Sequence, residues 1–525
     1  MSQKIQPSEL HCLRLQSVWR AAGDDRGVPF CVPPPAGRSS MVQFWKEHSR
    51  KATVEEMMLD SHAMELTKQE LPEVLSLLPC LAGQRVLELG AGIGRFTSHL
   101  LASAAHVTAV DFMENFVEKN RQDNGHHSNA SFLQADVTKL EFPLNSYSVI
   151  FSNWLLMYLS DEELGLLVEK MLGWLAPGGL LFFRESCNHQ SGDCKREFNP
   201  TNYRSQGQYS HLVTSAHWTQ TEGGQKFGFD IILTKKVQTY VKMKKNQNQI
   251  CWLLEKVPRP QVTPGGFLTF QQFLDNKQYT RRGILRYEKM FGAGFVSTGG
   301  LSTTKEFVDL LNLKPGQKVL DVGCGIGGGN FYMAKTFGVE VLGLDLSENM
   351  VEIAMERAID EKLPMVTFEV ADATKRSFEE GSFDVIYSRD TILHIDDKLA
   401  LFKRFHSWLR PGGQLLISDY CCGEKPWSPT FQDYVQQRGY VLYTPQQYGQ
   451  FIEEAGFCSV RAEDRTAQFI QVIQTELERA VAIKEEYITE VSEEDYLEVV
   501  RGWSDKLKRC NVGDQRWGLF YATKS

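Results

Sequence analysis

The sequence predicts two copies of one α/β domain in tandem, each built around a doubly wound parallel sheet. The first observation is internal self-similarity, which indicates a duplicated domain. The repeated landmarks lie 233 to 236 residues apart and are VLELGAGIGRF (86–96) and VLDVGCGIGGGNF (319–331), Asp111 and Asp345, Asp136 and Asp372, and WLAPGG (174–179) and WLRPGG (408–413). The second observation is that short apolar runs alternate with helical patterns in both copies, which is typical of parallel sheets.

Each copy contains the same order of expected elements. In the first copy they are strand 85–90, helix 94–104, strand 106–111, a helix from Met113, and strands 131–136 and 148–153. In the second copy the matching strands are 318–323, 339–345, 366–372 and 383–389. The PGG turns lead into LLFFRE (180–185) and QLLISDY (414–420), which we expect to be later strands of each sheet.

The regions outside the repeat set the expected domain boundaries. Residues 1–40 lack periodicity and are interpreted as a flexible leader, followed by domain 1 over 41–255. The Pro/Gly-rich stretch 256–277 is interpreted as a linker, and domain 2 follows over 278–525. The acidic, helix-rich stretch near the C-terminus reads as a solvated helical face.

Composition excludes several classes of protein. The chain has 57 Lys and Arg against 65 Asp and Glu, a net charge of −8, which disfavours a nucleic-acid binder. Its 11 cysteines include no CxxC pair, so neither a disulfide framework nor a zinc ribbon is expected, and no metal-ligand constellation is visible. With no apolar signal region and no run of about 20 apolar residues, we expect a soluble cytoplasmic protein, and a monomer is the favoured state.

The two glycine-rich turns are suited to a nucleotide. Glycines let the backbone approach a ligand at the carboxyl ends of parallel strands, and a carboxylate about twenty residues later can accept both ribose hydroxyls. A third acidic residue, Asp136 or Asp372, is placed to bind an adenine amino group. The expected cofactor residues are Glu88, Gly90, Gly92, Arg95, Asp111, Phe112, Asp136, Val137 and Asn153 in the first copy, and Asp321, Gly323, Gly325, Asp345, Leu346, Asp372, Ala373 and Arg389 in the second.

This set resembles the class I S-adenosylmethionine (SAM)-dependent methyltransferases, which have a Rossmann-like fold. An NAD-dependent dehydrogenase is the alternative for a glycine-rich turn alone. The spacing E/D-x-G-x-G-x-G and the third acidic position disfavour it. The resemblance implies SAM as cofactor and S-adenosylhomocysteine as product.

Longer strings are similar to one family, the tandem phosphoethanolamine N-methyltransferases of plants and some animals, over about residues 41–525. In the first half they are FWKEHS, VEEMMLDS, VLELGAGIGRFTSHL, FSNWLLMYLSDEE, WLAPGG, FFRESCNHQSGD, NPTNYR and KKNQNQICW. In the second half they are QYTRRGILRYEKMFGAGFVSTGG, VLDVGCGIGGGNFYMA, YSRDTILHI, LLISDYC, YVQQRGY and QRWGLFYATK. The resemblance implies three methyl transfers, from phosphoethanolamine through its mono- and dimethyl forms to phosphocholine, for phosphatidylcholine and choline synthesis.

The resemblance also implies catalytic residues in the second half. The acceptor ammonium has a pKa near 10, so a base must remove its proton before the nitrogen can attack. Tyr279 and His394 match the family's dyad over the amine, and Asp390 matches its amine-orienting carboxylate. The family pattern places Gln278, Tyr287, Ser297, Tyr420, Tyr434, Arg438, Tyr440 and Lys506 on the substrate. Arg and Lys suit its phosphate, and tyrosine rings suit a methylated ammonium.

The first half departs from this pattern. Aligning FSNWLLMY with YSRDTILH puts Trp154 opposite Asp390 and Tyr158 opposite His394, so the dyad is absent. Its substrate residues are expected to be Ser186, Ser191, Gly192, Arg196 and Tyr203, whose hydroxyls, backbone N–H and guanidinium could hold a phosphate. As in the related plant enzymes, we expect domain 1 to make the first methylation and domain 2 the later ones.

Two alternatives stay open from the residues alone. One is a SAM methyltransferase for another acceptor, such as glycine, a sterol or a phenol. The other is that one half is a regulatory module that binds SAM or product.

Overall fold

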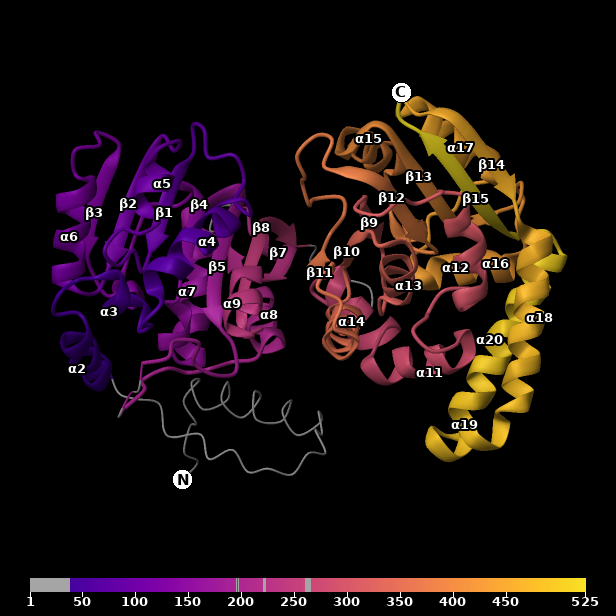
Figure 1. Ribbon diagram of the computed structural model, residues 1–525, viewed down its shortest axis with the longest axis horizontal. Helices are drawn as coiled ribbons and strands as arrows, with labels where there is room; N and C mark the ends of the chain where they lie inside the picture. Colours follow the sequence, from indigo (N-terminus) through magenta and orange to yellow (C-terminus); the bar gives the residue numbers. More distant parts are fainter. Residues whose placement is uncertain (1–37, 195, 197, 221–222, 260–265) are drawn as a thin grey trace.

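The computed structural model describes residues 38–194, 196, 198–220, 223–259 and 266–525. Most of the expected leader, residues 1–37, lies outside the described residues. Its last three residues already belong to helix α2, which begins at Arg38. Domain 1 comprises the elements from α2 to β8, and domain 2 those from α10 to β15. Figure 1 shows the two domains side by side.

Domain 1 is a mixed sheet covered by helices. Its strands are β1 (Arg85–Leu89), β2 (His106–Asp111), β3 (Ala130–Gln134), β4 (Tyr147–Asn153), β5 (Leu175–Ser186), β6 (Trp218–Thr219), β7 (Lys226–Lys236) and β8 (Gln249–Arg259). Its helices are α2 (Arg38–His48), α3 (Val54–Met58), α4 (Ala63–Leu75), α5 (Thr97–Leu101), α6 (Glu114–Asn124), α7 (Asp161–Trp174), α8 (Gln206–Ser215) and α9 (Gln238–Lys244), with short 3-10 turns η1 (Val137–Lys139) and η2 (Leu156–Tyr158).

Domain 2 repeats this arrangement and adds a helical extension. Its strands are β9 (Lys318–Val322), β10 (Glu340–Asp345), β11 (Val366–Ala371), β12 (Phe383–Arg389), β13 (Leu409–Cys422), β14 (Cys458–Asp464) and β15 (Gln515–Thr523). Its helical elements are α10 (Phe270–Phe273), the π-helical turn η4 (Leu274–Gln278), α11 (Arg281–Phe291), α12 (Gly300–Asp309), α13 (Gly328–Phe337), α14 (Glu348–Glu361), η5 (Ile392–His394), α15 (Lys398–Trp408), α16 (Pro429–Arg438), α17 (Pro445–Glu454), α18 (Thr466–Ala482), α19 (Lys484–Glu490) and α20 (Glu493–Asn511). The extension α18–α20 projects beside the domain (Figure 1).

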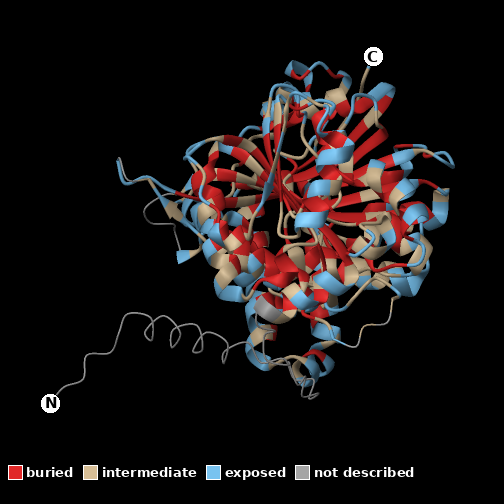
Figure 2. Ribbon diagram, turned by 90° about the vertical axis from the view of Figure 1, so that its left-hand side faces the viewer, coloured by how far each residue is buried: buried red, intermediate tan, exposed pale blue. Residues whose placement is uncertain are grey.

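The strand order confirms the expected fold class. The sheet runs β3-β2-β1-β4-β5-β8-β7 in domain 1 and β11-β10-β9-β12-β13-β15-β14 in domain 2. The first five strands of each series are parallel, and the last two are antiparallel to their neighbours. The central strands are buried (Figure 2), as expected for a sheet with helices on both faces. Within the described part of the chain, no helix combines the length and the apolar character that a membrane span needs.

The two sheets join edge to edge into one. Strand β7 of domain 1 pairs antiparallel with β11 of domain 2, with Thr234 opposite Val370 and Leu233 opposite Ala371. The Lys235 ammonium lies 2.5 Å from a carboxylate oxygen of the buried Glu369. Because β11 is also the third strand of the nucleotide-binding half of domain 2, domain 1 adjoins that half directly.

Two expectations from the sequence differ from the structure. The linker expected over 256–277 is structured at both ends, since β8 continues to Arg259 and α10 begins at Phe270; residues 260–265 lie outside the described residues. The helix expected over 94–104 is shortened to α5. Gly94 has a φ of +90°, a backbone conformation that cannot continue a right-handed helix.

Candidate active sites

Both glycine-rich turns fold in the same way at the carboxyl ends of the parallel strands. Gly92 and Gly325 have φ values of +56° and +53°, which glycine adopts without steric cost. The Gly92 N–H donates to Asp111 Oδ2 at 2.8 Å, and the Gly325 N–H donates to Asp345 Oδ2 at 3.0 Å. Burial raises the pKa of both carboxyls, against the backbone donors that favour their charged forms. Each acid therefore fixes its turn and lines the crevice.

A second carboxyl lies beside each turn at the end of the first strand. Burial raises the pKa of Glu88 to about 8, opposed by a 2.6 Å hydrogen bond from Thr97 Oγ1. Burial and then the Asp345 charge raise the pKa of Asp321 to about 8. Neither carboxyl forms an ion pair with a described Lys, Arg or His. A ligand with a positive charge and hydroxyl donors would stabilise the charged forms of these neighbouring carboxyls.

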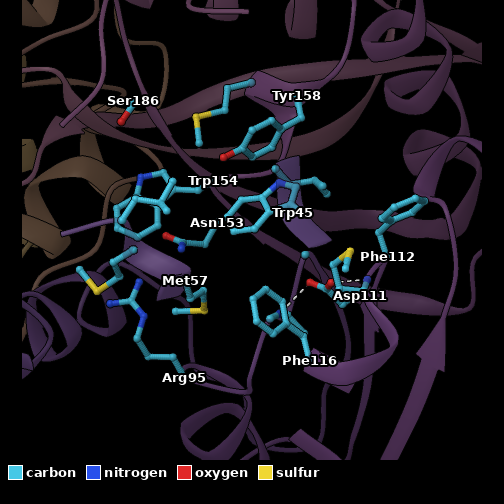
Figure 3. Close-up of a pocket in the computed structure, with 18 of the residues that line it drawn as sticks. Trp45, Met57, Arg95, Asp111, Phe112, Phe116, Asn153, Trp154, Tyr158 and Ser186 are labelled. Atoms are coloured by element: carbon cyan, nitrogen blue, oxygen red, sulfur yellow. Dashed lines mark hydrogen bonds between the residues drawn. The ribbon is translucent and has the colours of Figure 1, made fainter. Parts of the chain in front are cut away.

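The expected residues of the first half converge on one cavity of about 130 Å³. It is lined by Glu88, Gly90, Gly92, Arg95, Asp111, Phe112, Asp136, Val137, Asn153, Ser186, Ser191, Gly192, Arg196 and Tyr203. In Figure 3, Ser186 lies at one end of this cavity, cavity 1, and Asp111 and Phe112 at the other. The structure thus brings every residue expected for this half together, while their contacts with ligands stay predictions.

Trp154 forms a fixed wall of cavity 1. Its indole N–H donates to Gln249 Oε1 at 2.7 Å. The guanidinium carbons of Arg184 and Arg95 lie 4.1 Å and 5.2 Å from the centre of its ring. Both arginines are held by Glu70, a fully buried carboxylate whose pKa is lowered because the two cations outweigh its burial. The Trp154 ring is therefore held by cations that belong to the protein.

A loop between β5 and α8 lines the end of cavity 1 at which Ser186 lies. Gln249 Nε2 donates to Ser191 Oγ at 2.6 Å and also to Ser186 Oγ. Gly192 lies against the backbone of Leu59, where an added Cβ would come within 2.3 Å of the Leu59 carbonyl oxygen. The same loop is fixed by Asp193, which accepts from Ser61 N and Oγ at 2.8 and 2.6 Å. The hydroxyls of Ser186 and Ser191 are thereby placed at the cavity wall.

Domain 2 has a larger cavity, cavity 2, of about 510 Å³. It is lined by the expected residues Asp321, Gly323, Gly325, Asp345, Leu346, Asp372, Ala373, Arg389, Tyr279, Asp390, His394 and Ser297. Seven further residues expected on the substrate do not line this cavity: Gln278, Tyr287, Tyr420, Tyr434, Arg438, Tyr440 and Lys506. They form a polar and aromatic cluster next to it, and their contacts with a substrate also stay predictions.

His394 joins cavity 2 to this cluster. Its ring centre lies 5.0 Å from that of Tyr440. Burial, and then the charges of Lys398 and Arg438, lower the pKa of His394 to about 4, so its imidazole is neutral near pH 7. Neither ring nitrogen has a hydrogen-bond partner among the described residues. The neutral imidazole therefore has a free lone pair and an N–H group that no described residue uses, and both can form hydrogen bonds with a ligand.

Tyr279 lies on the same cavity and is held from its own segment. Gln278 Nε2 donates to the Tyr279 hydroxyl at 3.1 Å. Burial raises the pKa of Tyr279, so the phenol stays protonated near pH 7. Asp390 completes this group: it accepts from the Trp517 indole at 2.9 Å and from Thr298 N at 3.2 Å. All its partners are neutral, which leaves its negative charge available to a cation.

The cluster beside cavity 2 contains two cations, of which Lys506 lies near enough to the buried Glu476 to oppose the rise that burial causes in the pKa of that carboxyl. Lys506 donates to the Tyr420 hydroxyl at 3.1 Å. Arg438, at the end of α16, lies close enough to Tyr440 and Tyr434 to interact with them electrostatically. Neither cation forms an ion pair in the part of the chain that the structure describes. Unpaired cations beside phenol hydroxyls are suited to an anionic group such as a phosphate.

The structure adds lining residues that the sequence did not single out. Trp45 from α2 lies at cavity 1 with its ring centre 5.7 Å from that of Tyr158 (Figure 3). Phe270 and Leu274 line cavity 2, and the Phe270 ring centre lies 5.7 Å from that of His394. Trp45 belongs to FWKEHS, one of the strings that resemble the family. Phe270 and Leu274 lie in the Pro/Gly-rich stretch interpreted from the sequence as a linker, so no site was predicted there.

The residues at both turns fit SAM. Each turn has buried carboxyls, which can accept hydrogen bonds from ribose hydroxyls and attract the positive charge of the methionine moiety. The glycines leave little room for a Cβ, so the backbone can lie close to the ligand. In cavity 1, two buried guanidinium nitrogens of Arg95 are without a partner among the described residues, which suits a carboxylate ligand. Glu88, Asp111 and Asp136 in domain 1, and Asp321, Asp345 and Asp372 in domain 2, would hold it.

Comparisons with known proteins agree with this geometry. A family model described as a methyltransferase domain matches residues 86–179 and 319–413. Phosphoethanolamine N-methyltransferase 3 of Arabidopsis thaliana is 54% identical over 490 residues, covering 93% of this chain and 99% of that protein. A phosphoethanolamine N-methyltransferase of Triticum aestivum is 55% identical over 489 residues, 93% of this chain and 95% of that protein.

A solved structure is similar over most of the chain. It is Haemonchus contortus phosphoethanolamine N-methyltransferase 2 in complex with phosphomonomethylethanolamine and S-adenosylhomocysteine. The TM-score is 0.70 at 28% identity, covering 87% of this chain and 99% of that chain. The similarity therefore extends through both domains.

Proposed function

Because this chain belongs to the phosphoethanolamine N-methyltransferase family, we propose that domain 1 makes the first methylation of phosphoethanolamine and domain 2 the later two. The protein is a SAM-dependent methyltransferase, with S-adenosylhomocysteine as its product. It acts on phosphoethanolamine and its methylated forms, and phosphocholine is the end product. One observation supports this division of the methylations: both halves keep the cofactor residues, whereas the residues proposed to contact the acceptor differ between them.

The chemistry assigned to domain 2 follows from its neutral base. SAM supplies a methyl group activated on a sulfonium sulfur. The acceptor nitrogen must lose its proton before its lone pair can form the new C–N bond, and we assign this proton to His394, whose neutral imidazole has a free lone pair. A phosphate bound at Arg438 would offset one of the charges that lower the pKa of His394. We assign the orientation of the cationic amine to the carboxylate of Asp390 and the closure of the site to the Tyr279 hydroxyl, since both residues line cavity 2.

Domain 1 lacks this combination. Trp154 stands where domain 2 has Asp390, and Tyr158 where it has His394. Burial raises the pKa of Tyr158, so it is a protonated phenol rather than a ready base. Trp154 thus places an indole at cavity 1 where cavity 2 has a carboxylate. We assign the first methylation to domain 1 on this difference in lining and on the resemblance to the plant enzymes.

The phosphate is assigned a separate end of each site. In domain 2 we assign it to Arg438, Lys506 and the hydroxyls of Tyr420, Tyr434 and Tyr440, with Gln278, Tyr287 and Ser297 nearby. In domain 1 we assign it to Ser186, Ser191, the Gly192 backbone, Arg196 and Tyr203. These assignments explain why an acceptor without a phosphate would bind weakly to either half.

We place the enzyme in the cytoplasm as a monomer, with domain 1 ending at β8 and domain 2 starting near Gly266. The nine described cysteines are free thiols, which supports a reducing compartment.

An acceptor panel tests the substrate class. Initial rates with labelled SAM are compared for phosphoethanolamine, ethanolamine and glycine. We expect phosphoethanolamine to exceed the other two by at least a hundredfold in kcat/KM, because both sites place cations or hydroxyls for a phosphate. Equal rates with ethanolamine would contradict the proposal.

A further inference from the structure

Helix α8 of domain 1 reaches the cofactor-binding half of domain 2. Ser210 Oγ donates to Glu348 Oε1 at 2.6 Å, and Gln206 Nε2 donates to the same oxygen at 3.3 Å. Gln206 and Ser210 are four residues apart and so lie on one face of α8, and both are buried. One carboxylate oxygen of domain 2 thus receives two donors from domain 1.

Glu348 is the first residue of α14, three residues after the ribose-binding acid Asp345. Between them lie Leu346, which lines cavity 2, and Ser347, whose hydroxyl caps α14 by accepting from Met350 N at 3.3 Å. A displacement of the start of α14 would therefore move the segment that carries Asp345.

The start of α14 also holds the segment that carries Tyr279. Asp275 in η4 accepts from Ser347 Oγ at 2.5 Å and from Glu348 N at 3.2 Å. Asn349 Nδ2 donates to the Tyr279 carbonyl at 2.9 Å and to the Asp275 carbonyl at 3.0 Å. Cofactor acid and catalytic tyrosine are thus anchored to the same helix end.

On the other side, α8 continues directly from the substrate loop of domain 1. Tyr203 lines cavity 1, and the next residue, Arg204, donates to the carbonyls of Leu156 and Leu159 at 3.2 and 2.6 Å. Ser205 then caps α8 by accepting from Gln208 N at 3.2 Å. A short, hydrogen-bonded segment therefore links the acceptor end of site 1 to Glu348.

The arrangement is asymmetric between the halves. The residue of domain 1 that corresponds to Glu348 is Glu114, the first residue of α6, which is exposed and next to the outer strands of its sheet. Domain 2 has a second tie to its neighbour, because the N–H of the adenine acid Asp372 donates to the Ile232 carbonyl of domain 1 at 3.1 Å. Domain 1 therefore contacts site 2 at the start of α14, which follows β10, and at the end of β11.

We propose that Glu348 is a positioning residue through which helix α8 of domain 1 holds the cofactor loop and the Tyr279 segment of site 2. Domain 1 is then part of the scaffold of the second active site as well as the host of the first. The inference rests on the proposed function only for the choice of acceptor in its test.

The test compares both sides of the contact in full-length protein whose site 1 carries Asp111→Ala. Ser210→Ala, Glu348→Ala and Glu348→Gln are measured by SAM titration calorimetry, by kcat and KM with phosphomonomethylethanolamine, and by amide hydrogen exchange over residues 274–279 without SAM. Glu114→Ala and His211→Ala are the matched controls, the second on an exposed position of α8.

We expect Ser210→Ala and Glu348→Ala to raise the Kd for SAM about five- to tenfold and to speed exchange over 274–279, because hydrogen bonds that join the Glu348 carboxyl to α8 are lost. Glu348→Gln keeps the acceptor oxygen and should restore most of the affinity. With Asp345→Ala in place of Asp111→Ala, Ser210→Ala should leave SAM binding at site 1 within twofold.

Unchanged SAM affinity and exchange in both Ser210→Ala and Glu348→Ala, or equal losses at both sites, would overturn the proposal. If the division of methylations were wrong, the Asp111→Ala protein would not turn over phosphomonomethylethanolamine. The titration and the exchange measurement would still report on Glu348, so the two failures are distinguishable.

Discussion

Trp154 and Asp390 occupy equivalent positions in the two halves, and each has a left-handed backbone directly after the fourth strand of its sheet. Their φ values are +55° and +51°, although neither is glycine. Strands β4 and β12 end at the preceding residues, Asn153 and Arg389, and the short turns η2 and η5 end at Tyr158 and His394. The two halves thus share this backbone conformation but differ in the side chain, which is an indole in domain 1 and a carboxylate in domain 2.

The charge of Asp390 should matter most for domain 2. In protein carrying Asp111→Ala, we expect Asp390→Asn to lower kcat/KM for phosphomonomethylethanolamine about 10- to 100-fold, since a charged hydrogen bond contributes about 1.5–3 kcal/mol. Steady-state kinetics with labelled SAM measure this. Trp154→Phe, at the matching position of site 1, is the control and should leave this reaction unchanged. A loss of less than twofold for Asp390→Asn would contradict the assignment.

Arg438 should act on the phosphate of the acceptor. We expect Arg438→Ala in the same background to raise KM for phosphomonomethylethanolamine at least tenfold with a smaller change in kcat, because its guanidinium forms no ion pair with a described carboxylate and is the group we propose for the phosphate. Arg438→Lys, which keeps the charge, should lose less. Arg461→Ala, an arginine on the outer strand β14, is the matched control. A fall in kcat without a change in KM would argue against phosphate binding.

The buried His394 should make stability depend on pH. An unfolded histidine binds a proton near pH 6.5, whereas the pKa of folded His394 is about 4, so the unfolded state binds more protons between these values. Stability from this group is therefore lost as the pH falls from about 6.5 to 4. Urea unfolding at several pH values should show a steeper loss for the wild type than for His394→Phe.

The exposed His211→Ala is the control for that experiment and should keep the wild-type pH dependence. Parallel curves for wild type and His394→Phe would show that the imidazole is not held neutral by the fold.

Glu70 should be a large contributor to the stability of domain 1. It is fully buried between Arg95 and Arg184, and its removal leaves two buried cations without a counter-charge. We expect Glu70→Gln to lower the free energy of unfolding by about 3–5 kcal/mol, measured by urea unfolding, and to weaken SAM binding at site 1. Glu65→Gln, on the exposed face of the same helix, should change stability by less than about 0.5 kcal/mol. Equal stabilities of the two variants would contradict this role.

The sequence was sufficient for the parts of the molecule that repeat. Duplicated glycine turns and acids such as Asp111 and Asp345 predicted two like domains, because strand ends of a parallel sheet place such residues in one crevice. Phe270 was missed because a Pro/Gly-rich stretch reads as a linker even where it folds over a cavity. Glu70 could not be recognised, since a charged residue in a helix reads as exposed until its arginine partners are placed.

Contacts between distant segments were also beyond the sequence. Ser210 and Glu348 are 138 residues apart, and the packing of domain 1 against domain 2, which includes the pairing of β7 with β11, brings them together. The tyrosine cluster around Tyr440 was assigned by resemblance, and the structure places it beside cavity 2 rather than on its lining. Both arrangements depend on how helices and strands pack against one another, which the local sequence pattern does not specify.

Product analysis after silencing each half tests the division of labour most directly. Asp111→Ala and Asp345→Ala proteins are incubated with phosphoethanolamine or phosphomonomethylethanolamine and methyl-labelled SAM, and the products are separated over time. The account predicts that Asp345→Ala converts phosphoethanolamine only to phosphomonomethylethanolamine, whereas Asp111→Ala carries phosphomonomethylethanolamine to phosphocholine and leaves phosphoethanolamine unchanged. Loss of all activity on phosphoethanolamine in Asp345→Ala, or its conversion to phosphocholine there, would contradict the account.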